Sequence, residues 1–284
     1  MSATPPPGWA YAPELPLQTS PLWQWPPRPA AVLKWYWNSW FWLTVTLIVL
    51  GLAVISSIAA TPSAADPVVL FVGVLVRNVA ILLIVAGGLH LWFYRWREQA
   101  ANRQYDARSF GEGRLFSFGS QVHDNMFWTL ASGAVIWSGY EALMLWSLAQ
   151  GYVAPTSFAQ SPIWFCLVFF LIPIWESFYF YWIHRFLHWP PLYRLAHALH
   201  HRNTNIGPWS GLSMHPVEHL MFFGSVLIHF ALPTDPIHIT FHLMFYGLLA
   251  VTTHTGFEGV VAGDKKRLHL GNFHHQMHHR YFEC

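Results

Sequence analysis

The sequence predicts an all-α integral membrane protein with four long transmembrane helices and a shorter helical hairpin. Hydrophobic residues make up 54% of the 284 residues, and aromatic residues make up 18%. Charged residues make up only 10%, whereas ordinary soluble chains contain about 25%. Several apolar stretches also reach the length of about 20 helical residues that a bilayer core of about 30 Å requires.

Four apolar stretches are long enough for full membrane spans. They are residues 38–60, 68–94, 126–150 and 162–183. Two shorter stretches, 217–232 and 237–253, lie on either side of a turn that contains Pro233 and Pro236. They are consistent either with thin or tilted spans or with a re-entrant hairpin that does not cross the bilayer.

The N-terminal segment, residues 1–30, is rich in proline and predicts a disordered tail. No Lys or Arg precedes an apolar core there, so the segment is not a secretory signal peptide. An alternative is that Trp9, Trp23 and Trp25 rest on a membrane surface.

Charge and cysteine content exclude several classes of protein. The net charge of +2 is too small to indicate a nucleic-acid partner. The two cysteines, Cys166 and Cys284, exclude a disulfide framework and any cysteine-rich zinc or iron–sulfur site.

The basic residues predict the orientation of the chain. Fourteen of the fifteen lie before the first span, between the second and third, after the fourth or after the hairpin. The positive-inside rule makes that side cytoplasmic. The sequence therefore predicts a multi-pass protein with both termini in the cytoplasm and a basic cytoplasmic loop at 95–125. Only Arg77 falls within a span, and we assign it no function.

The same orientation places 13 of the 18 histidines on the cytoplasmic side. They are His184, His188, His197, His200, His201, His215, His219, His254, His269, His274, His275, His278 and His279. The other five, His90, His123, His229, His238 and His242, are interpreted as structural or gating groups. His242 is expected to satisfy a hydrogen bond within the hairpin.

Histidine spacing predicts a metal centre. Residues three and four apart share one side of a helix, and the chain repeats this spacing in HRFLH (184–188), HALHH (197–201), HPVEH (215–219) and HQMHH (275–279). Neutral imidazole is a common ligand for iron, zinc, copper and nickel. Two triplets and a pair supply eight nitrogen ligands, which is more than one ion takes. We therefore predict two neighbouring metal ions in a cytoplasmic helical cap.

At these residues the chain resembles the fatty acid hydroxylase/sterol desaturase superfamily of histidine-rich membrane di-iron enzymes. The matching segments are HRFLH, HALHH, MHPVEH (214–219), HTGFE (254–258) and NFHHQMHH (272–279). The resemblance implies a catalytic domain at 161–284, whereas the transmembrane helices predicted at 31–160 rest on the pattern of apolar spans alone. Family members usually continue beyond the last motif, so we expect that the C-terminus is truncated at Cys284.

The resemblance also implies the ligand set. The implied metal ligands are His184, His188, His197, His200, His201, His215, His254, His275, His278 and His279. The implied supporting residues are His219, Glu258 and His274, of which Glu258 is a further candidate ligand. No other catalytic residue is implied.

The implied activity is hydroxylation or desaturation of a C–H bond in a sterol, fatty acyl chain or related lipid. It uses O₂, two Fe ions and two electrons from an external ferredoxin or cytochrome b5-type donor, and zinc is expected as a substitute in purified protein. The alternatives are a histidine-rich membrane metal transporter, which would distribute its ligands along the spans, and a structural metal-binding membrane protein.

Overall fold

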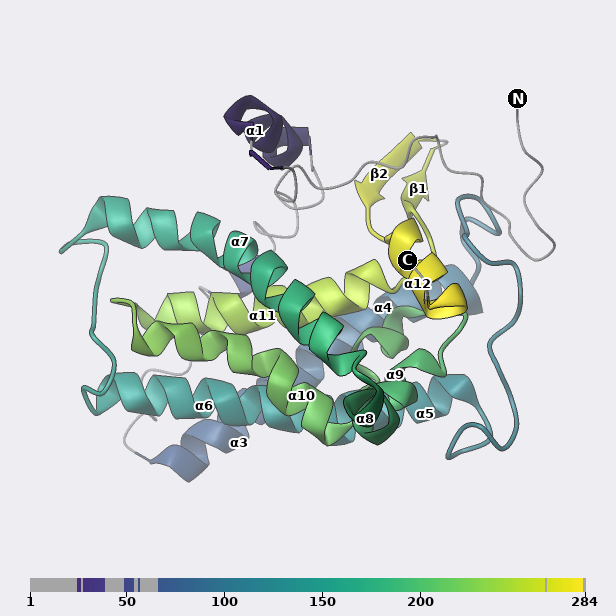
Figure 1. Ribbon diagram of the computed structural model, residues 1–284, viewed down its shortest axis with the longest axis horizontal. Helices are drawn as coiled ribbons and strands as arrows, with labels where there is room; N and C mark the ends of the chain where they lie inside the picture. The colour runs from purple at the N-terminus through teal and green to yellow at the C-terminus, as the bar shows by residue number, and fades with distance from the viewer. Residues whose placement is uncertain are drawn as a thin grey trace.

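The computed structural model describes residues 25–26, 28–38, 49–53, 56, 66–263 and 265–282. Within them the chain is mostly helical, and the long helices run side by side along the longest axis of the molecule (Figure 1). The long helical elements are α3 (Pro67–Leu82), α6 (Val135–Ala149), α7 (Pro162–Leu187), α10 (Pro216–Phe223) and α11 (Pro236–Thr253). The shorter ones are α1 (Pro29–Asn38), α4 (Gly88–His90), α5 (Gln121–Trp128), α8 (Pro190–Leu192), α9 (Ala198–His201) and α12 (Phe273–Tyr281).

Short π- or 3₁₀-helical segments also occur among the described residues. The π-helical segments are η3 (Leu83–Gly87), η4 (Leu91–Arg95), η5 (Thr129–Ala134) and η6 (Tyr193–His197). The 3₁₀ segments are η7 (Pro208–Leu212) and η8 (Gly224–Phe230). The segments η3 to η6 continue or join α-helices, η8 extends α10, and η7 stands alone between two loops.

Four of the long helices begin with proline. These prolines are Pro67, Pro162, Pro216 and Pro236. Proline suits the first turn because its missing N–H group would have no helical partner there. Asp66 and Asp235 add N-caps, and their carboxylates accept hydrogen bonds from Val68 N at 2.8 Å and Ile237 N at 3.0 Å. The sequence therefore fixes where each helix starts.

Among the described residues, three helices are long and apolar enough to cross a membrane. They are Pro67–Arg95, Pro162–Leu187 and Pro236–Thr253. The first two match predicted spans. The third was expected as one arm of a short hairpin, but its 18 residues suffice. The other arm, Pro216–Phe230, is shorter, and its second half is 3₁₀-helical.

The described residues therefore do not confirm the expected count of four long transmembrane helices. Most of the predicted span 38–60, like most of the tail 1–30, lies outside the described residues. The predicted span 126–150 is helical from Gln121 to Ala149, but it is not among the three helices with sufficient hydropathy. Polar side chains at Ser132, Ser138 and Glu141 are buried in this stretch, and they lower its hydropathy.

The fold is also not entirely α-helical. Strands β1 (Gly259–Ala262) and β2 (Lys265–His269) pair antiparallel next to α12 (Figure 1). β-Branched Val260 and Val261 favour an extended backbone, and Gly263, at φ +58°, allows the left-handed backbone of the tight turn. This hairpin is the one exception among the described residues to the predicted all-α class.

Arg77 within the first described span pairs with Glu141 on α6. Asn78 lies beside this pair and donates to Ser138 Oγ at 3.0 Å. An ion pair supported by hydrogen bonds offsets the cost of placing charge among apolar helices. Arg77 therefore joins α3 to α6.

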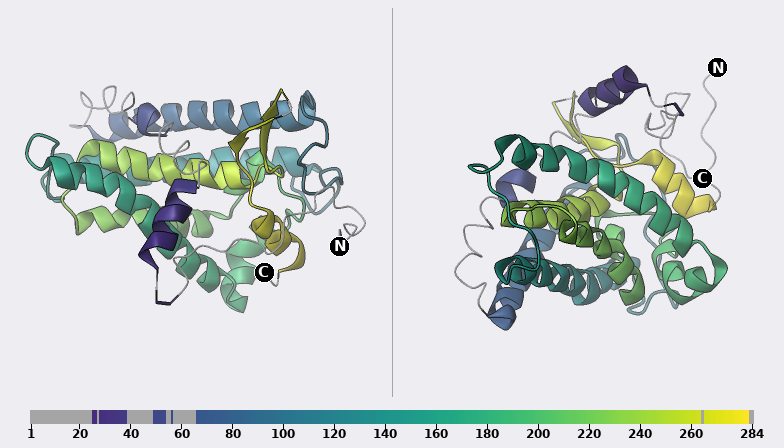
Figure 2. Two further views of the ribbon diagram at one scale, coloured as in Figure 1. Left: turned by 90° about the horizontal axis from the view of Figure 1, so that it is seen from above. Right: turned by 60° about the vertical axis from the view of Figure 1, so that its left-hand side comes forward.

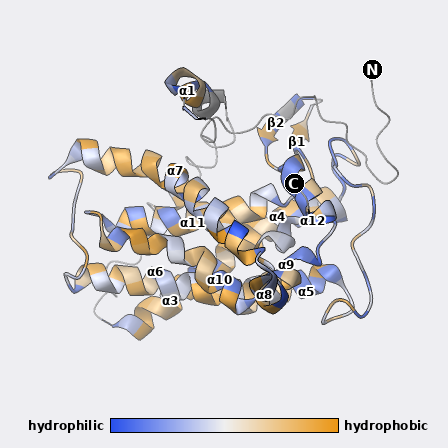
Figure 3. Ribbon diagram, viewed as in Figure 1, coloured by the Kyte–Doolittle hydropathy of each residue, from blue (hydrophilic) through white to orange (hydrophobic). Residues whose placement is uncertain are grey.

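The two ends of the bundle differ in composition. At one end, α6 is connected to α7 and η8 to α11 by loops; the other end carries α5, α8, α9, α12 and the β-hairpin (Figures 1 and 2). Hydrophobic residues dominate the long helices, and hydrophilic residues gather on α5, α9, α12 and the adjoining loops (Figure 3). α11 is the central helix, since 78% of its most apolar 18-residue stretch is buried, compared with 28% for the corresponding stretch of α7.

Candidate metal centre

Eight histidines gather into two groups of four at the end of the bundle that carries α9 and α12. One group contains His184, His188, His201 and His278, and the other contains His200, His254, His275 and His279. Within each group, one nitrogen from each ring lies within 4.8 Å of the others. Each group could therefore hold one metal ion.

In the first group, three Nε2 atoms form a triangle. His184 Nε2 lies 3.0 Å from His188 Nε2 and 2.9 Å from His278 Nε2, and the third side measures 3.0 Å. A neutral imidazole nitrogen either donates one proton or accepts along one lone pair. Three such atoms cannot satisfy three mutual contacts with hydrogen bonds, so the triangle is better explained as a ligand set.

The second group repeats this arrangement. His275 Nε2 lies 3.0 Å from His254 Nε2 and 3.1 Å from His279 Nε2, and the remaining side measures 3.3 Å. Its members come from the end of α11 and from α12. His200 completes the group from α9, with its ring centroid 4.6 Å from that of His279.

These separations fit nitrogen ligands of metal ions. With a metal–nitrogen bond of about 2.1 Å, neighbouring ligands of an octahedral ion lie about 3.0 Å apart and those of a tetrahedral ion about 3.4 Å apart. Five of the six measured sides lie between 2.9 and 3.1 Å. Both nitrogens of His201 are also buried without a hydrogen-bond partner. The donor set therefore fits two metal ions.

Local helix geometry divides neighbouring histidines between the two groups. His200 and His201 are adjacent on α9, and successive helical residues point about 100° apart. They therefore face different groups. On α12, His278 joins the first group, whereas His275 and His279, four residues apart on one side of the helix, join the second.

Several of these rings are oriented by contacts at their other nitrogen. His200 Nδ1 lies 3.3 Å from Ser213 O, and His254 Nδ1 lies 2.7 Å from Ala250 O. A carbonyl can only accept, so both rings carry their proton on Nδ1 and direct the Nε2 lone pair inward. Contacts of this kind are typical of metal-binding histidines.

His197 lies beside the first group and belongs to neither set of four. Its ring centroid lies 4.5 Å from that of His201 and 4.8 Å from that of His188. Its Nδ1 contacts Glu218 Oε1 at 2.7 Å, while its Nε2 is buried and has no hydrogen-bond partner. This geometry makes His197 a candidate fifth ligand, oriented by a carboxylate.

Burial keeps these imidazoles neutral. It lowers the pKa of His197 and of His200 to about 3 and that of His254 to about 4. The pKa of His188 falls to about 4 because of burial and of neighbouring His197 and His278. Neutral imidazole has the free lone pair that a metal ion requires.

The remaining predicted residues lie outside the two groups. His215 Nδ1 accepts from Val217 N at 3.2 Å and caps α10. His219 is buried between Ser132 Oγ and Leu212 O, at 2.9 and 3.1 Å. Glu258 pairs with Arg103, and His274 is exposed on α12.

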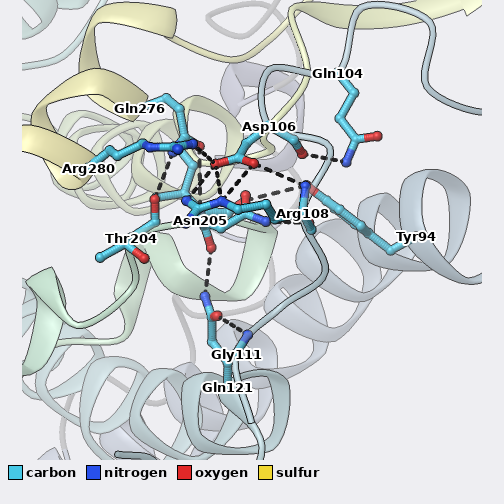
Figure 4. Close-up of polar contacts among 11 residues, drawn as sticks. Tyr94, Gln104, Asp106, Arg108, Gly111, Gln121, Thr204, Asn205, Gln276 and Arg280 are labelled. Carbon is cyan, nitrogen blue, oxygen red and sulfur yellow. Dashed lines mark hydrogen bonds and ion pairs between the residues drawn. The ribbon is translucent and has the colours of Figure 1, made fainter. Parts of the chain in front are cut away.

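A polar network outside the histidines fastens α12 in place (Figure 4). Gln276 accepts from Ile206 N at 3.3 Å and donates to Thr204 O at 3.0 Å, just after the HALHH segment. Arg280 donates to buried Asp106 at 2.7 Å. Asp106 also accepts from Arg108 at 2.7 Å. The network joins α12 to residues 204–206 and to residues 106–108.

Sequence reasoning overlooked Glu218, Asp106 and Gln276. A signal existed for Glu218, since an acidic residue stands between two histidines in HPVEH. No local signal existed for Asp106, because its partner Arg280 lies 174 residues away.

A comparison with known families agrees with this geometry. Residues 168–284, which include all eight grouped histidines, match the family model described as "Fatty acid hydroxylase". No solved structure matches the chain significantly.

Curated relatives are similar over the same part of the chain. The Delta(7)-sterol 5(6)-desaturase ERG3B of Gibberella zeae is 27% identical over 123 residues, which cover 43% of this chain and 38% of the relative. The Delta(7)-sterol 5(6)-desaturase ERG3 of Saccharomyces cerevisiae is 30% identical over 102 residues, which cover 36% and 27%. The methylsterol monooxygenase erg25A of Aspergillus fumigatus is 50% identical over 36 residues, which cover 13% and 11%. The matched segments thus span well under half of each relative's length.

Proposed function

We propose that the chain is a membrane-bound non-haem di-iron oxygenase of the fatty acid hydroxylase/sterol desaturase superfamily, because residues 168–284 match the fatty acid hydroxylase family model and resemble sterol desaturases. Its substrate is a sterol, fatty acyl chain or related lipid, and its product is an alcohol or an alkene. It uses O₂ and two electrons from an external donor. The observation that carries this proposal is the pair of four-histidine groups, with nitrogen separations of 2.9–3.3 Å.

The first iron is held by His184, His188, His201 and His278, and the second by His200, His254, His275 and His279. His197 is a fifth ligand of the first ion. Bound iron supplies the activation of O₂ that attack on an unactivated C–H bond requires. The buried imidazoles would hold the ions away from bulk water, and Glu218 would accept a hydrogen bond from His197 Nδ1–H so that Nε2 faces the metal.

The position of the site suits a lipid substrate. His184 and His188 lie at the end of α7, one of the three described helices able to cross a membrane. A lipid can therefore approach from the bilayer without leaving it. The names of the curated relatives, sterol desaturases and a methylsterol monooxygenase, support a sterol or a similar lipid.

Electrons come from a soluble partner on the same side of the membrane. Exposed basic side chains on the 95–121 loop and the β-hairpin are Arg95, Arg97, Arg114, Lys265 and Arg267. Their positive charge favours a ferredoxin or a cytochrome b5-type donor, whose docking surface is acidic. The positive-inside rule places this face, and with it the metal site, in the cytoplasm.

Comparative lipid analysis tests this function. Membranes that contain the wild-type chain are compared with membranes that contain the His200→Ala, His201→Ala double variant, which removes one ligand from each group. We expect a lipid that gains one oxygen or loses two hydrogens only with the wild type. Identical lipid profiles, together with iron-free purified protein and no oxygen uptake, would contradict the proposal and favour a transport or structural role.

A further inference from the structure

A second set of buried polar side chains lies within the membrane bundle, away from the two histidine groups. It consists of Glu176 on α7, Ser225 and His229 on η8, Thr234 in the following loop and His242 on α11. Each is at most 1% exposed. Ionisable groups among apolar helices are costly and typically serve a function.

These side chains form one continuous series of contacts. Thr234 Oγ1 lies 2.8 Å from His229 Nδ1, and His229 Nε2 lies 3.0 Å from His242 Nδ1. His242 Nε2 in turn contacts Glu176 Oε1. Each imidazole therefore uses one nitrogen toward the loop and the other toward Glu176. This is the hydrogen bond within the hairpin that we expected for His242, extended at both ends.

Two assignments of protons fit these contacts. In one, Thr234 donates to His229 Nδ1, His229 donates from Nε2 to His242 Nδ1, and His242 donates from Nε2 to an ionised Glu176. In the other, Glu176 is protonated and every donor in the series points back toward the loop. Ser225 Oγ donates to the same carboxylate oxygen at 2.7 Å and lies 3.1 Å from His242 Nε2. Passing one proton along the series converts the first assignment into the second.

A metal path is a poorer explanation of this series. Metal ligands converge on one point, as in the two four-histidine groups, whereas these nitrogens bond to one another in sequence. The two groups at the other end of the bundle are the metal-like clusters among the described residues, and neither contains Glu176, His229 or His242.

Aromatic side chains lie between the end of the series and the metal centre. Tyr246 follows His242 by one helical turn on α11, and its ring lies 3.8 Å from that of Phe222 and 6.4 Å from that of Phe180. Phe180 in turn packs against His184 at 4.9 Å. Three oxygens in this part of the bundle, Glu176 Oε2, Tyr246 Oη and Glu218 Oε2, are buried without a hydrogen-bond partner.

We propose that Thr234, His229, His242 and Glu176 form a proton path from the face opposite the metal centre into the membrane bundle. The path rests on the proposed function, because hydroxylation or desaturation with O₂ and two electrons consumes two protons. In each step one proton crosses one hydrogen bond. The His242 Nε2–H bond breaks as an O–H bond forms on Glu176, His229 then reprotonates His242 Nδ1, and Thr234 reprotonates His229. Thr234 has no exposed surface, so it regains its proton when a water molecule enters beside the exposed residues Ala231 and Pro233.

Two other titratable groups near the path, His238 and Tyr179, have hydrogen-bond partners outside it. His238 accepts from Asp235 N at 3.1 Å and donates to Phe165 O at 2.9 Å, so both its nitrogens contact backbone. Tyr179 donates to Met221 O at 2.7 Å. His238 lies on α11 one turn before His242 and is also fully buried, which makes it a matched control.

The test measures proton exchange at Glu176 without requiring turnover. The metal-loaded full chain is reconstituted in vesicles, and its orientation is determined by protease cleavage of the 95–121 loop. The pH is then changed only on the face of the 231–236 loop, while difference infrared spectroscopy follows the Glu176 carboxyl band, identified by its loss in Glu176→Gln. We expect the band to respond to that face, and His229→Gln to slow the response by about a hundredfold.

His238→Gln is expected to leave the response unchanged, and similar melting temperatures for both variants verify that they fold. A band that follows the pH of the metal-site face, or a His229→Gln response as fast as wild type, would overturn the path. A second readout is a pH dye enclosed in vesicles whose 231–236 loop faces the lumen. We expect the luminal pH to rise as O₂ is consumed, because protons are taken up from the loop face. Absence of oxygen uptake would contradict the proposed function, whereas the infrared result would still decide the path.

Discussion

Replacing Asp106 by Asn should loosen α12 and weaken metal binding. Asp106 is 1% exposed, and its carboxylate accepts from Arg280 at 2.7 Å and from Arg108 at 2.7 and 3.0 Å. Arg280 lies on the helix that carries His275, His278 and His279. The substitution keeps the size of the side chain and removes its charge, so it isolates the electrostatic contribution.

The size of the effect follows from the exposure of the two arginines. The Arg280 side chain is 16% exposed and that of Arg108 is 44% exposed. Removing one partner of a fully buried pair costs about 3–5 kcal/mol, whereas an exposed pair contributes about 0–1 kcal/mol. We therefore expect a loss of about 2–3 kcal/mol for Asp106→Asn, most of it from Arg280.

Thermal unfolding in detergent and metal analysis measure the two effects. Asp106→Asn should lower the melting temperature and the metal content, with the loss largest for the group that contains His275 and His279. Glu98→Gln, which neutralises an exposed acid in the same loop, should change neither. Wild-type melting and full metal content in Asp106→Asn would refute a structural role for this network.

Three further outcomes follow from the structure. Burial holds the folded-state pKa of His188 and His254 at about 4 and that of His197 and His200 at about 3, below the unfolded value of about 6.5. The unfolded chain therefore binds more protons, and the unfolding midpoint of metal-free protein should fall as the pH drops from about 6.5 to 4. A midpoint that does not change with pH would contradict this prediction. Glu218→Gln should weaken metal binding by about 10–100-fold, because His197 loses its anionic partner; equal affinities in a chelator competition would show that Glu218 does not act through His197. Gly211→Ala should destabilise the fold by about 1–3 kcal/mol or more, because the added Cβ would lie 2.2 Å from Ala250 O. Gly139→Ala is the control, since its added Cβ meets nothing within 4 Å. Equal melting temperatures for the two variants would be inconsistent with the close packing of η7 on α11.

The sequence predicted which histidines lie in the metal site, but it did not predict which of the two groups each histidine joins. The HxxHH spacing indicated that His197, His200 and His201 share a helical region with inward-facing rings, and eight predicted ligands lie together. The assignment of His200 and His201 to different groups depends on where α7, α11 and α12 lie around α9. That arrangement is set by tertiary packing, which the spacing of residues along one helix does not contain.

In the membrane helices, too, the sequence predicted features of single segments but not contacts between segments. Apolar length located Pro67–Arg95 and Pro162–Leu187, because burial in lipid depends on composition along one segment. It did not locate the Arg77–Glu141 pair or the series from Thr234 to Glu176, whose partners come from different helices. Isolated histidines such as His229 and His242 have no spacing signal, and their significance becomes visible only when η8, α7 and α11 pack together.

The central claim, that the two four-histidine groups each bind one metal ion, is tested most directly by counting iron in anaerobically prepared protein. The wild type should bind two iron ions per chain. His188→Ala and His254→Ala, one from each group, should each retain about one, and His274→Ala, which alters an exposed histidine on the same helix as three ligands, should retain two. One iron or none in the wild type, or an equal loss in His274→Ala, would contradict the claim.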